Sequence, residues 1–521
     1  MERKRKARPR IRFYLVLLMF CLETLFFIGF LACIILIPFI KLLWIPVILI
    51  TLIDIILSIF IANTNVNSGY KVSWLVTLLC FPLGGAILYL LYADKITTKK
   101  MKQLRFSPIN KSLNEGKDDS TQVLNEIKNK DEDAYFIANG LYKNAISSIY
   151  KNTNITYYKI GDDAFKPMLE ELKKAKSYIF MEYFIIDPGI FFDSVYEILK
   201  EKAKEGVDVR LLYDDFGSVF KVKAFFYKRA IADGIKCYAF NRCRPFMDIR
   251  QNNRDHRKIL VIDGKVGFTG GINIADEYIN KEERFGVWKD NCLRLKGEAV
   301  NGLTNLFISN WNLVDKKNKL DPKAYKYKKE SGSEDFSKEI GYIQPFGDVP
   351  FDNEESARNA HLQLIFKAKK YIYLCTPYLI PDEELLQALC IASRSGVDVK
   401  IITPGIPDKK MVYVATRSFY SKLAFYGVKI YEYTPGFNHE KMMVVDDKYV
   451  LTGTVNFDYR SFYLHFENDL FIYDSPKIIE MRDDLIEMLS VSKRIDDKKY
   501  LNLKWYKKIV YGLIRVISPL L

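Results

Sequence analysis

Residues 256–263 of this chain read HRKILVID, and residues 439–446 read HEKMMVVD. Both stretches begin one pattern, H-x-K-x4-D-x6-G-x2-N, which the sequence contains twice without a gap. The four apolar residues between the lysine and the aspartate of each stretch are typical of a buried strand. Because so long a pattern recurs in otherwise different sequence, we interpret the chain as two equivalent halves.

The two halves also match outside this pattern. Similar segments recur in the same order, as AKSYIF (175–180) and AKKYIY (368–373), GVDVRLLYD (206–214) and GVDVKIITP (396–404), and GIKCYAF (234–240) and GVKIYEY (427–433). Strands alternate with helices, which are predicted at 168–175 and 385–393, and this alternation predicts an α/β fold. We expect two α/β/α repeats packed pseudo-symmetrically, with their motif strands together at one shared active site.

Each motif strand offers an imidazole beside an ammonium group. Residues two apart on a strand share a face, so His256 and Lys258 point the same way, as do His439 and Lys441. One histidine can attack phosphorus, while the other protonates the leaving alkoxide and then deprotonates an incoming alcohol or water. The lysines can stabilise charge on the phosphate oxygens. We favour His256 as the nucleophile and His439 as the acid and base, and the reverse assignment stays open.

The other motif residues are given supporting roles. Asp263 and Asp446 lie seven positions after the histidine, an odd offset, so we interpret them as residues that hold the motif in place. Asn273 and Asn456 belong to the next turn, where their amides can donate to phosphate oxygens. No group of cysteines and histidines has the spacing of metal ligands, so neither a metal nor a cofactor is expected.

At this point the sequence resembles the bacterial cardiolipin synthase family of the phospholipase D superfamily, from about residue 72 to the C-terminus. The resemblance rests on residues 252–278 and 437–462 around the two motifs, on TPYLIPDEELLQAL (376–389) and on WKDNCLRLKGEAV (288–300). It implies phosphatidyl transfer between two phosphatidylglycerol molecules through a phosphohistidine, giving cardiolipin and glycerol. Glu467 resembles the family's downstream acid and is expected to orient a catalytic histidine, with an ordinary surface carboxylate as the alternative.

Two positions around the second motif depart from the family pattern. Glu440 occupies the variable position between His439 and Lys441, and His465 stands where the family suggests asparagine. We interpret both as tolerated variation. The catalytic residues cannot separate synthesis from phospholipase D-type hydrolysis, because the two reactions differ only in the acceptor. A membrane scaffold with an inactive fold is disfavoured, since both motifs are complete.

Charge and composition indicate a membrane enzyme. The net charge is +15, and basic residues gather at 3–12, 95–105 and 498–515. Such clusters beside apolar segments favour a surface of anionic phospholipids, and the family resemblance implies phosphatidylglycerol as the lipid partner. Nucleic acid is not an expected partner. A protein that binds nucleic acid is expected to carry its basic patches on a soluble domain without a membrane anchor. The oligomeric state stays open, and the eight scattered cysteines give no disulfide framework.

Three apolar segments, at 13–40, 42–62 and 72–93, are long enough to span a bilayer. Glu23 and Asp54 lie within them and are functional candidates. Basic clusters on both sides favour cytoplasmic ends, which requires an even number of crossings. Pro82 makes the third segment a candidate for a bent hairpin. We expect a multi-pass protein of the cell membrane with a cytoplasmic catalytic part, whereas three full crossings would place that part outside.

These observations predict the following organisation. The expected parts are a membrane region (1–95), a linker (96–134), a first phospholipase D-like repeat (135–314), a second linker (315–338), a second repeat (339–490) and a basic tail (491–521). The tail mixes aromatic, basic and aliphatic residues, as an interfacial amphipathic helix does. An ordinary packed C-terminal helix is the alternative.

Overall fold

The computed structural model describes residues 44–93, 99–242, 252–329, 334–352 and 354–520, together with Leu25, Ile28 and Gly29. The chain forms two compact units, one up to Ile96 and one from Thr97 onward, with Leu520 grouped with the first. The basic cluster at 3–12 and the predicted membrane segment 13–40 with Glu23 lie outside the described residues, apart from the three N-terminal positions named above.

The first unit contains α2 (Trp44–Ala62), α3 (Ser68–Cys80) and α4 (Pro82–Tyr92). Among the described residues, one helix is long and apolar enough to cross a membrane, at Ile45–Ala62. It coincides with the predicted segment 42–62.

The predicted segment 72–93 is not a single long helix, because it is divided between α3 and α4. The chain bends at Phe81, where α3 ends and Pro82 begins α4. Proline is accepted in the first turn of a helix but cannot continue a preceding one, because it lacks the N–H and its ring clashes with the previous turn. The rings of Trp74 and Tyr89 meet edge to face at 5.3 Å, so the two helices fold back as the predicted hairpin.

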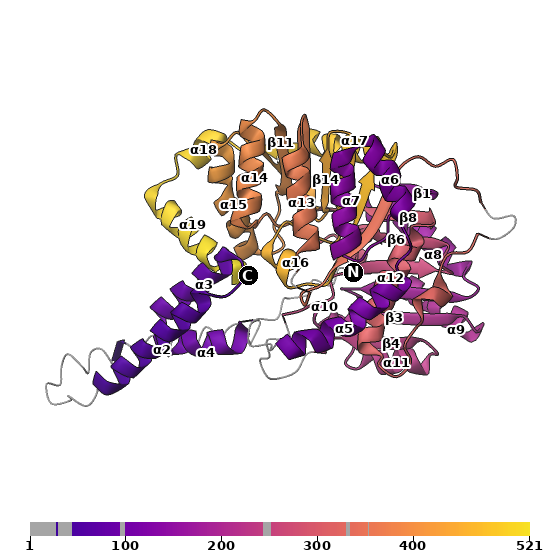
Figure 1. Ribbon diagram of the computed structural model, residues 1–521, viewed down its shortest axis with the longest axis horizontal. Helices are drawn as coiled ribbons and strands as arrows, with labels where there is room; N and C mark the ends of the chain where they lie inside the picture. Colours follow the sequence, from indigo (N-terminus) through magenta and orange to yellow (C-terminus); the bar gives the residue numbers. More distant parts are fainter. Residues whose placement is uncertain are drawn as a thin grey trace. The chain divides into compact units, whose positions relative to one another are not determined.

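The second unit contains two mixed sheets that repeat one arrangement (Figure 1). The first sheet has the order β1-β8-β6-β5-β2-β3-β4. Its strands are β1 (Thr153–Tyr158), β2 (Tyr178–Tyr183), β3 (Asp208–Asp214), β4 (Lys236–Phe240), β5 (Lys258–Ile262), β6 (Val266–Gly270) and β8 (Cys292–Gly297). Strands β2, β3 and β4 are parallel, and the remaining neighbours pair antiparallel.

The second sheet has the order β17-β12-β11-β10-β14-β15-β16-β9. Its strands are β9 (Tyr342–Asp348), β10 (Tyr371–Cys375), β11 (Asp398–Pro404), β12 (Lys429–Tyr433), β14 (Met442–Val445), β15 (Tyr449–Gly453), β16 (Glu467–Tyr473) and β17 (Ser492–Arg494). Strands β10, β11 and β12 are parallel. The motif strand β14 pairs antiparallel with β10, just as the motif strand β5 pairs with β2. The duplicated α/β architecture is therefore confirmed.

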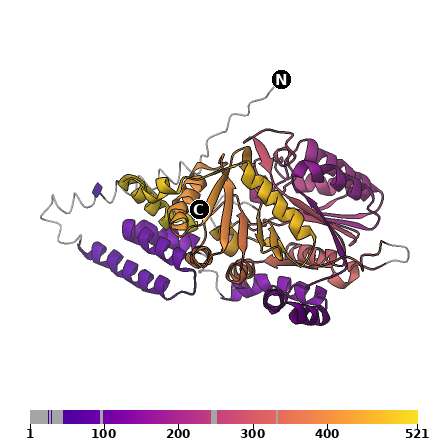
Figure 2. The ribbon, with the colours of Figure 1, turned by 90° about the horizontal axis from the view of Figure 1, so that it is seen from above.

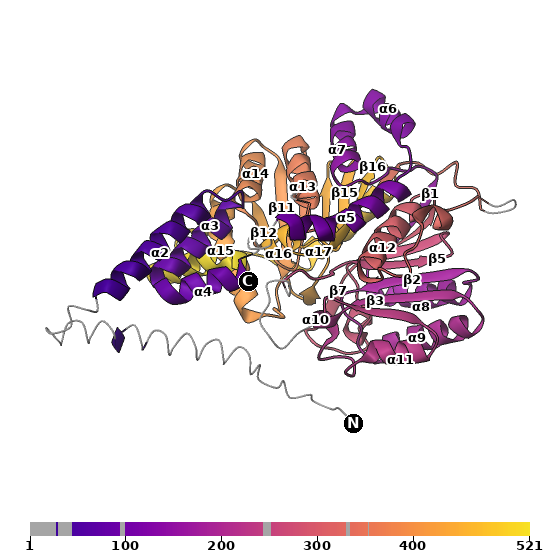
Figure 3. The same ribbon diagram turned by 60° about the horizontal axis from the view of Figure 1, so that its bottom comes forward.

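Helices cover the two sheets. They are α8 (Gly161–Lys173), α9 (Ile190–Lys204), α10 (Asp215–Ser218), α11 (Phe226–Ala232), α12 (Val300–Val314), α13 (Ser356–Lys367), α14 (Glu383–Arg394), α15 (Lys410–Phe425), α16 (Tyr459–Tyr463) and α17 (Lys477–Ser490). Figure 3 shows α8, α9 and α11 on the outer face of the first sheet. The helices predicted at 168–175 and 385–393 are present as α8 and α14. They are not equivalent, because α8 precedes β2 whereas α14 follows β10.

One apolar core joins the halves. Helices α12 and α17 pack between the two sheets, and the core includes Phe180, Phe307, Val444 and Leu485, all fully buried. Figure 2 shows the two sheets side by side, with the gold helix α17 crossing near their junction. A second core lies beneath α8 and α9 on the outer face of the first sheet. Because the sheets share one core, the two motif strands are held in a fixed relation.

The predicted linker at 96–134 is helical where it is described, which corrects its interpretation. It contains α5 (Lys99–Gly116) and α6 (Thr121–Lys130), and α7 (Glu132–Asn144) follows. Ile109, Leu113, Leu124 and Ile127 are buried. Their three- and four-residue spacing is that of a helix packed on one side, but polar residues dominate the segment and conceal it. The second repeat also extends beyond residue 490, because β17 pairs with β12.

The C-terminal tail contains α18 (Asp497–Leu501) and α19 (Trp505–Ile517). None of the residues of α19 is buried, although Trp505, Ile509 and Leu513 are apolar. Lysines and Arg515 occupy other positions of the same helix. The helix contacts α15, and its exposed residues combine apolar and basic side chains as the predicted amphipathic helix does.

Candidate active site

The two motifs begin at the junction of the halves, where each pairs with a strand from the other half. The backbone N–H of His256 donates to the carbonyl of Phe466 at 2.8 Å, and the N–H of His439 donates to the carbonyl of Lys289 at 2.8 Å. Two short strands, β7 (Val287–Lys289) and β13 (Gly436–Asn438), pair in parallel beside the second motif. The histidines are therefore positioned by backbone that the opposite half supplies.

Each motif histidine also contacts a carboxylate from the opposite half. Nδ1 of His256 lies 2.9 Å from Oε2 of Glu467, and Nδ1 of His439 lies 2.5 Å from Oδ2 of Asp290. Glu467 is fully buried, so the alternative of a surface carboxylate is wrong. The structure thus places a His–carboxylate pair at each motif, with the two partners exchanged between the halves.

The sequence interpretation assigned no role to Asp290. A signal was nevertheless present, since WKDNC (288–292) and HFEND (465–469) occupy equivalent positions. Gly270 pairs with Cys292, and Gly453 pairs with Asp469. Asp290 and Glu467 each lie two residues before the strand residue that faces the motif glycine, and aligning the halves on these strands would have identified the second carboxylate.

The motif lysines lie beside their histidines and are buried. Nζ of Lys258 donates to the carbonyl of His256 at 2.8 Å. Nζ of Lys441 donates to the carbonyl of His439 and also lies 2.8 Å from its Nδ1. Both ammonium groups interact electrostatically with Asp290 and Glu467. Both lysines and both carboxylates therefore belong to one cluster, in which the cations can meet an anionic substrate.

Burial dominates the protonation of these cations and histidines. It lowers the pKa of Lys258 to about 7, with a further contribution from repulsion by Lys441. It lowers the pKa of Lys441 to about 8, although Asp290 acts in the opposite direction. The pKa of His256 falls to about 3 because burial outweighs the attraction of Glu467. Burial likewise lowers the pKa of His439. Both imidazoles are therefore neutral at physiological pH.

The two carboxylates differ from each other. Burial raises the pKa of Asp290 to about 7, and the nearby lysines only partly oppose this shift. Burial also acts to raise the pKa of Glu467, but the charge and hydrogen bonds of His256 and His465 lower it well below its usual range. Thr454 donates a further hydrogen bond to Glu467 at 2.5 Å. Glu467 is thus firmly anionic, whereas Asp290 lies close to its protonation midpoint at neutral pH.

The motif aspartates lie away from the histidines and hold the strand ends. Asp263 and Asp446 adopt the left-handed conformation, with φ of 52° and 55°. The carboxylate of Asp263 accepts three backbone N–H bonds, from residues 176–178, each at 2.8 Å. Asp446 accepts the equivalent bonds from residues 369–371. This geometry fixes the turn after each motif strand to the strand before it.

The motif asparagines are buried near the site. Oδ1 of Asn273 accepts the N–H of Ile185, and its Nδ2 donates to the hydroxyl of Tyr278 at 2.7 Å. Oδ1 of Asn456 is buried. The amide of Asn273 is therefore already engaged within the protein, and a phosphate oxygen would have to compete with Tyr278 for it.

A second pair of asparagines, not assigned from the sequence, links the halves directly. Asn468 donates to the hydroxyl of Thr269 at 2.8 Å, and Asn291 donates to Thr452 at 3.0 Å. Each threonine in turn donates to the carbonyl of a motif lysine. These bonds connect the residue after each carboxylate to the opposite motif strand, and so fix the spacing of the two motif strands.

Glu440 faces away from the histidines, into a buried ionic cluster. Nζ of Lys289 lies 3.1 Å from Glu440 and 2.7 Å from Asp484, and the hydroxyl of Tyr157 donates to both carboxylates. This corrects the interpretation of Glu440 as merely tolerated, because its carboxylate joins both halves. Burial raises the pKa of Glu440 to about 7.

We expect replacement of Lys289 with methionine to lower the free energy of unfolding by about 3–5 kcal/mol at neutral pH, because it leaves buried carboxylates without their cation. The deficit should shrink as the pH falls below 7, since Glu440 then takes up a proton. Denaturant unfolding of the detergent-solubilised protein at two pH values measures both effects.

The matched control is Glu487→Gln, which breaks the exposed Lys159–Glu487 pair and should change stability by less than about 1 kcal/mol. A Lys289→Met loss no larger than that of the control would contradict the role given to this cluster.

His465, the other departure from the family pattern, is also part of the site. Its Nδ1 lies 3.4 Å from Glu467, and its ring centroid lies 5.5 Å from that of His256. Ligand atoms of His256, His465 and Glu467 lie within 4.8 Å of one another, the spacing of a metal site. A metal ion there would displace the hydrogen bond between His256 and Glu467, so the residues fit their own hydrogen-bonded arrangement better than a metal centre.

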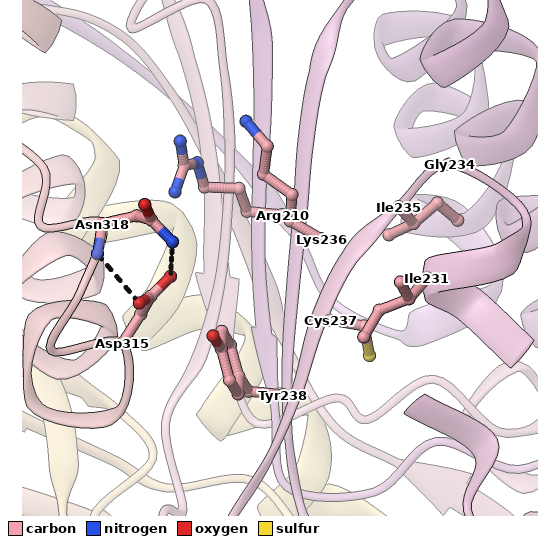
Figure 4. A pocket seen from close by; sticks show the side chains of 9 residues that line it. All are labelled: Arg210, Ile231, Gly234, Ile235, Lys236, Cys237, Tyr238, Asp315 and Asn318. Atoms are coloured by element: carbon pink, nitrogen blue, oxygen red, sulfur yellow. Dashed lines mark hydrogen bonds between the residues drawn. The ribbon is translucent and has the colours of Figure 1, made fainter. Parts of the chain in front are cut away.

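A cavity of about 460 Å³ lies elsewhere, at the start of β3 and β4 (Figure 4). Arg210 and Lys236 line it, but both form ion pairs with Asp208. The motif histidines are not among its lining residues. Because β3 and β4 are parallel and the cavity adjoins their amino ends, it lies at the opposite edge of the sheet from the motif residues. We therefore assign the chemistry to the histidine cluster.

Known proteins resemble this chain over most of its length. The family described as "Cardiolipin synthase, PLD-like domain" matches residues 168–311 and 361–489, and the family "Phospholipase_D-nuclease N-terminal" matches residues 47–92. An uncharacterized protein of Streptococcus mutans is 36% identical over 89% of this chain and 99% of its own length. Cardiolipin synthase 2 of Bacillus anthracis is 35% identical, over 89% of this chain and 88% of its own length.

The fold has a solved counterpart. The crystal structure of phosphatidylserine synthase from Haemophilus influenzae aligns with a TM-score of 0.54 at 17% identity. The alignment covers 70% of this chain and 93% of that one. At this identity the likeness concerns the architecture of the two halves.

Proposed function

The chain belongs to the cardiolipin synthase family with phospholipase D-like domains and is a phosphatidyltransferase, and from this premise we propose that it joins two phosphatidylglycerol molecules into cardiolipin, releasing glycerol. The observation that carries the proposal is the exchange of carboxylates between the halves. His256 pairs with Glu467 and His439 with Asp290, which gives two oriented histidines in one cluster with Lys258 and Lys441.

In the first step, Nε2 of His256 attacks the phosphorus of one phosphatidylglycerol. The bond from phosphorus to the glycerol oxygen breaks, and Nε2 of His439 gives that oxygen a proton while Nδ1 takes one from Asp290 or Lys441, so that glycerol leaves and the imidazole stays neutral. The phosphatidyl group then rests on His256 as a phosphohistidine. Lys258 and Lys441 stabilise the negative charge on the non-bridging oxygens, where single preorganised donors typically contribute about 3–4 kcal/mol.

In the second step, a hydroxyl of another phosphatidylglycerol takes the place of the glycerol that left. His439, now lacking its proton, takes the proton from this hydroxyl as the oxygen attacks phosphorus. The bond between phosphorus and Nε2 of His256 breaks and its electron pair returns to the imidazole. Nε2 of His439 regains its proton, Nδ1 returns its own to Asp290 or Lys441, and cardiolipin is released from an enzyme in its starting state.

The hydrogen bonds support His256 as the nucleophile. Glu467 is firmly anionic and faces Nδ1 of His256, so this nitrogen carries the proton and Nε2 keeps a free electron pair. Nδ1 of His439 instead faces the ammonium group of Lys441 and Asp290, and both can donate to it. A neutral His439 that accepts at Nδ1 carries its proton at Nε2, as an acid requires.

The reaction should weaken as the pH rises above about 7. The pKa of Lys258 is lowered to about 7 and that of Lys441 to about 8. Above these values each ammonium group loses its proton, and with it the charge that binds phosphate. The ratio kcat/KM reports groups of the free enzyme, so its pH profile should fall in this range.

A Lys258→Arg variant tests the cause of this alkaline fall. Guanidinium keeps its charge but fits a lysine site less well, so the rate should be lower overall and the fall near pH 7 should disappear. A wild-type profile that stays flat to pH 9 would show that neither lysine loses its proton in the working enzyme.

Product analysis tests the proposed function. Purified protein is incubated with phosphatidylglycerol labelled in its headgroup glycerol and in its acyl chains, and the lipids are resolved. Cardiolipin and free glycerol in equal amounts are expected. Phosphatidic acid as the main product would instead identify a phospholipase D-type hydrolase, in which water replaces the second lipid.

We place the protein at the cell membrane with its catalytic unit on the cytoplasmic side. The spanning-length helix at Ile45–Ala62 supports membrane attachment. The exposed apolar residues and lysines of α19 support a further contact with anionic lipid. Protease treatment of intact and of opened cells tests the orientation, because a cytoplasmic catalytic unit is cleaved only after opening.

A further inference from the structure

Two loops at equivalent positions of the halves expose large apolar side chains. The first loop contains α10 and runs to Phe225, and its side chains of Phe216, Phe220 and Phe225 are 52%, 89% and 58% exposed. The second loop follows β11 and leads into α15, and Ile406 in the loop and Met411 at the start of α15 are 38% and 48% exposed. Clustered exposed apolar residues mark surfaces that contact a partner or a membrane.

Both loops open at the edge of the sheets where the motif residues lie. The first loop follows β3 and the second follows β11, which are the middle strands of the two parallel sets. Tyr183, at the end of β2, pairs with Lys258, and Cys375, at the end of β10, pairs with Met442. Because parallel strands end at the same edge, both loops lie beside the start of a motif strand.

The first loop is fixed to the strand that carries His256. The carboxylate of Asp214 accepts the N–H of Asp255 at 3.0 Å and also caps α10. Ser218 accepts the N–H of Ile186 at 3.1 Å. The neighbouring Phe184 ring contacts His256 edge to face at 5.0 Å. The exposed phenylalanines are therefore held at a set position relative to the nucleophile.

The second loop is tied to the surroundings of His439. Asp408 accepts a hydrogen bond from the hydroxyl of Tyr378 at 2.6 Å. The ammonium group of Lys409 lies 3.3 Å from the hydroxyl oxygen of Tyr378. Lys409 also acts electrostatically on His439. The two loops thus flank the shared site from opposite halves, one beside each histidine.

The loops combine these apolar residues with basic ones. Lys223 and Lys228 are exposed around the first loop, and Lys409 and Lys410 are exposed on the second. Lys228 lies over the Phe225 ring at 5.0 Å. Apolar side chains flanked by lysines suit a surface of anionic phospholipid, where the rings enter the acyl boundary and the ammonium groups stay at the headgroups.

We propose that residues 216–225 and 406–411 form a two-part docking rim that inserts into an anionic phospholipid bilayer on both sides of the active-site opening. The inference rests on the proposed function for its lipid substrate. His256 and His439 are each only 6% exposed, so a phosphodiester must move a short way out of the headgroup layer to reach them. Insertion of both loops holds the opening at headgroup depth, and the acyl chains remain in the bilayer.

Fluorescence quenching tests insertion without any measurement of activity. The full chain carrying Phe220→Trp is placed in phosphatidylglycerol vesicles whose acyl chains are brominated. The added tryptophan emission, relative to the unsubstituted chain, should be quenched by the brominated lipid and shielded from a water-soluble quencher.

The matched control for quenching is Phe366→Trp. Phe366 is 58% exposed and precedes β10, at the opposite edge of the second sheet. Its emission should respond to the water-soluble quencher alone. Quenching of the Phe220→Trp emission only from the water would overturn the proposal.

Kinetics with a double variant, Phe220→Ser with Ile406→Ser, test the consequence for the reaction. Turnover is measured on anionic vesicles and on the same lipid dispersed in detergent. The ratio of the vesicle rate to the dispersed rate should fall at least roughly tenfold, which matches the transfer of one large apolar side chain from lipid to water. Phe366→Ser should leave the ratio unchanged.

The two proposals fail in different ways. An equal loss in both assays would overturn the docking rim, because the loops would then act within the reaction. If the unsubstituted protein formed phosphatidic acid in place of cardiolipin, the proposed function would fail, and the quenching result would still decide whether the loops insert.

Discussion

Replacing His256 with alanine is expected to reduce phosphatidyl transfer by at least about 10⁴-fold, since removal of a covalent nucleophile is among the largest single losses an enzyme shows. The fold should be retained. Glu467, the buried partner of this histidine, keeps the hydrogen bond from Thr454 and its contact with His465. Turnover of labelled phosphatidylglycerol measures the loss, and circular dichroism verifies the fold.

His361 offers a matched control, because it is a buried histidine outside the cluster. Its Nδ1 lies 2.8 Å from the carbonyl of Ala357 within its own helix. His361→Gln should therefore lower transfer by less than about tenfold.

A label experiment assigns the two roles. Brief exposure to phosphorus-labelled lipid should leave an acid-labile phosphatidyl group on His256 in the unsubstituted protein, and none in the His256→Ala protein. Label on His439 in the His256→Ala protein would reverse the assignment. Near-normal turnover by both variants would exclude a shared site.

Replacing Glu467 with glutamine is expected to lower turnover by about 10³–10⁴-fold without loss of the fold. Glutamine keeps the shape of the side chain but can turn an amide N–H toward Nδ1 of His256. The imidazole proton then moves to Nε2, and the electron pair that attacks phosphorus is lost. The effect acts through His256, so Glu467 is a positioning residue.

The equivalent substitution in the other half separates the roles of the two histidines. An Asp290→Asn side chain can also donate to Nδ1 of His439, but this keeps the proton on Nε2, where an acid needs it. We therefore expect the loss from Asp290→Asn to be at least about tenfold smaller than that from Glu467→Gln. Equal losses would contradict the asymmetry between the histidines, and a larger loss from Asp290→Asn would reverse their roles.

The duplicated α/β architecture could be predicted because spacing and alternation express it directly. The two motifs and the alternation of strands with helices followed from residues that lie close together in the chain. Glu467 was expected to orient a catalytic histidine, and its burial is a finding of the structure. Asp290 could not be found in the same way. It contacts His439 across 149 positions, and no local pattern links the two residues. The pairing depends on how the halves pack, and it becomes visible only when strands of both halves are compared.

The interpretations of the linker at 96–134 and of Glu440 were wrong because the polarity of a segment does not show which of its side chains are buried. Residues 99–130 are rich in charged and polar side chains, yet a few apolar positions such as Ile109 and Leu124 are enough to pack two helices onto the protein. Glu440 lies between His439 and Lys441, so its side chain points to the strand face opposite theirs. That face is covered by α17, whose Asp484 shares the buried cation Lys289. The alternation of residues on a strand shows to which face a side chain points. It does not show which element packs on that face.

The exchange of carboxylates between the halves also bears on descent. A chain with only one such half would hold a histidine and a carboxylate that cannot reach each other, so two copies would have to associate about a two-fold axis before either histidine was oriented. Once both copies lay in one gene, each could change, but only together with a residue of the other. Substitutions would then be inherited together within the crossed pairs, His256 with Glu467 and His439 with Asp290. The two members of each pair come from different ancestral copies.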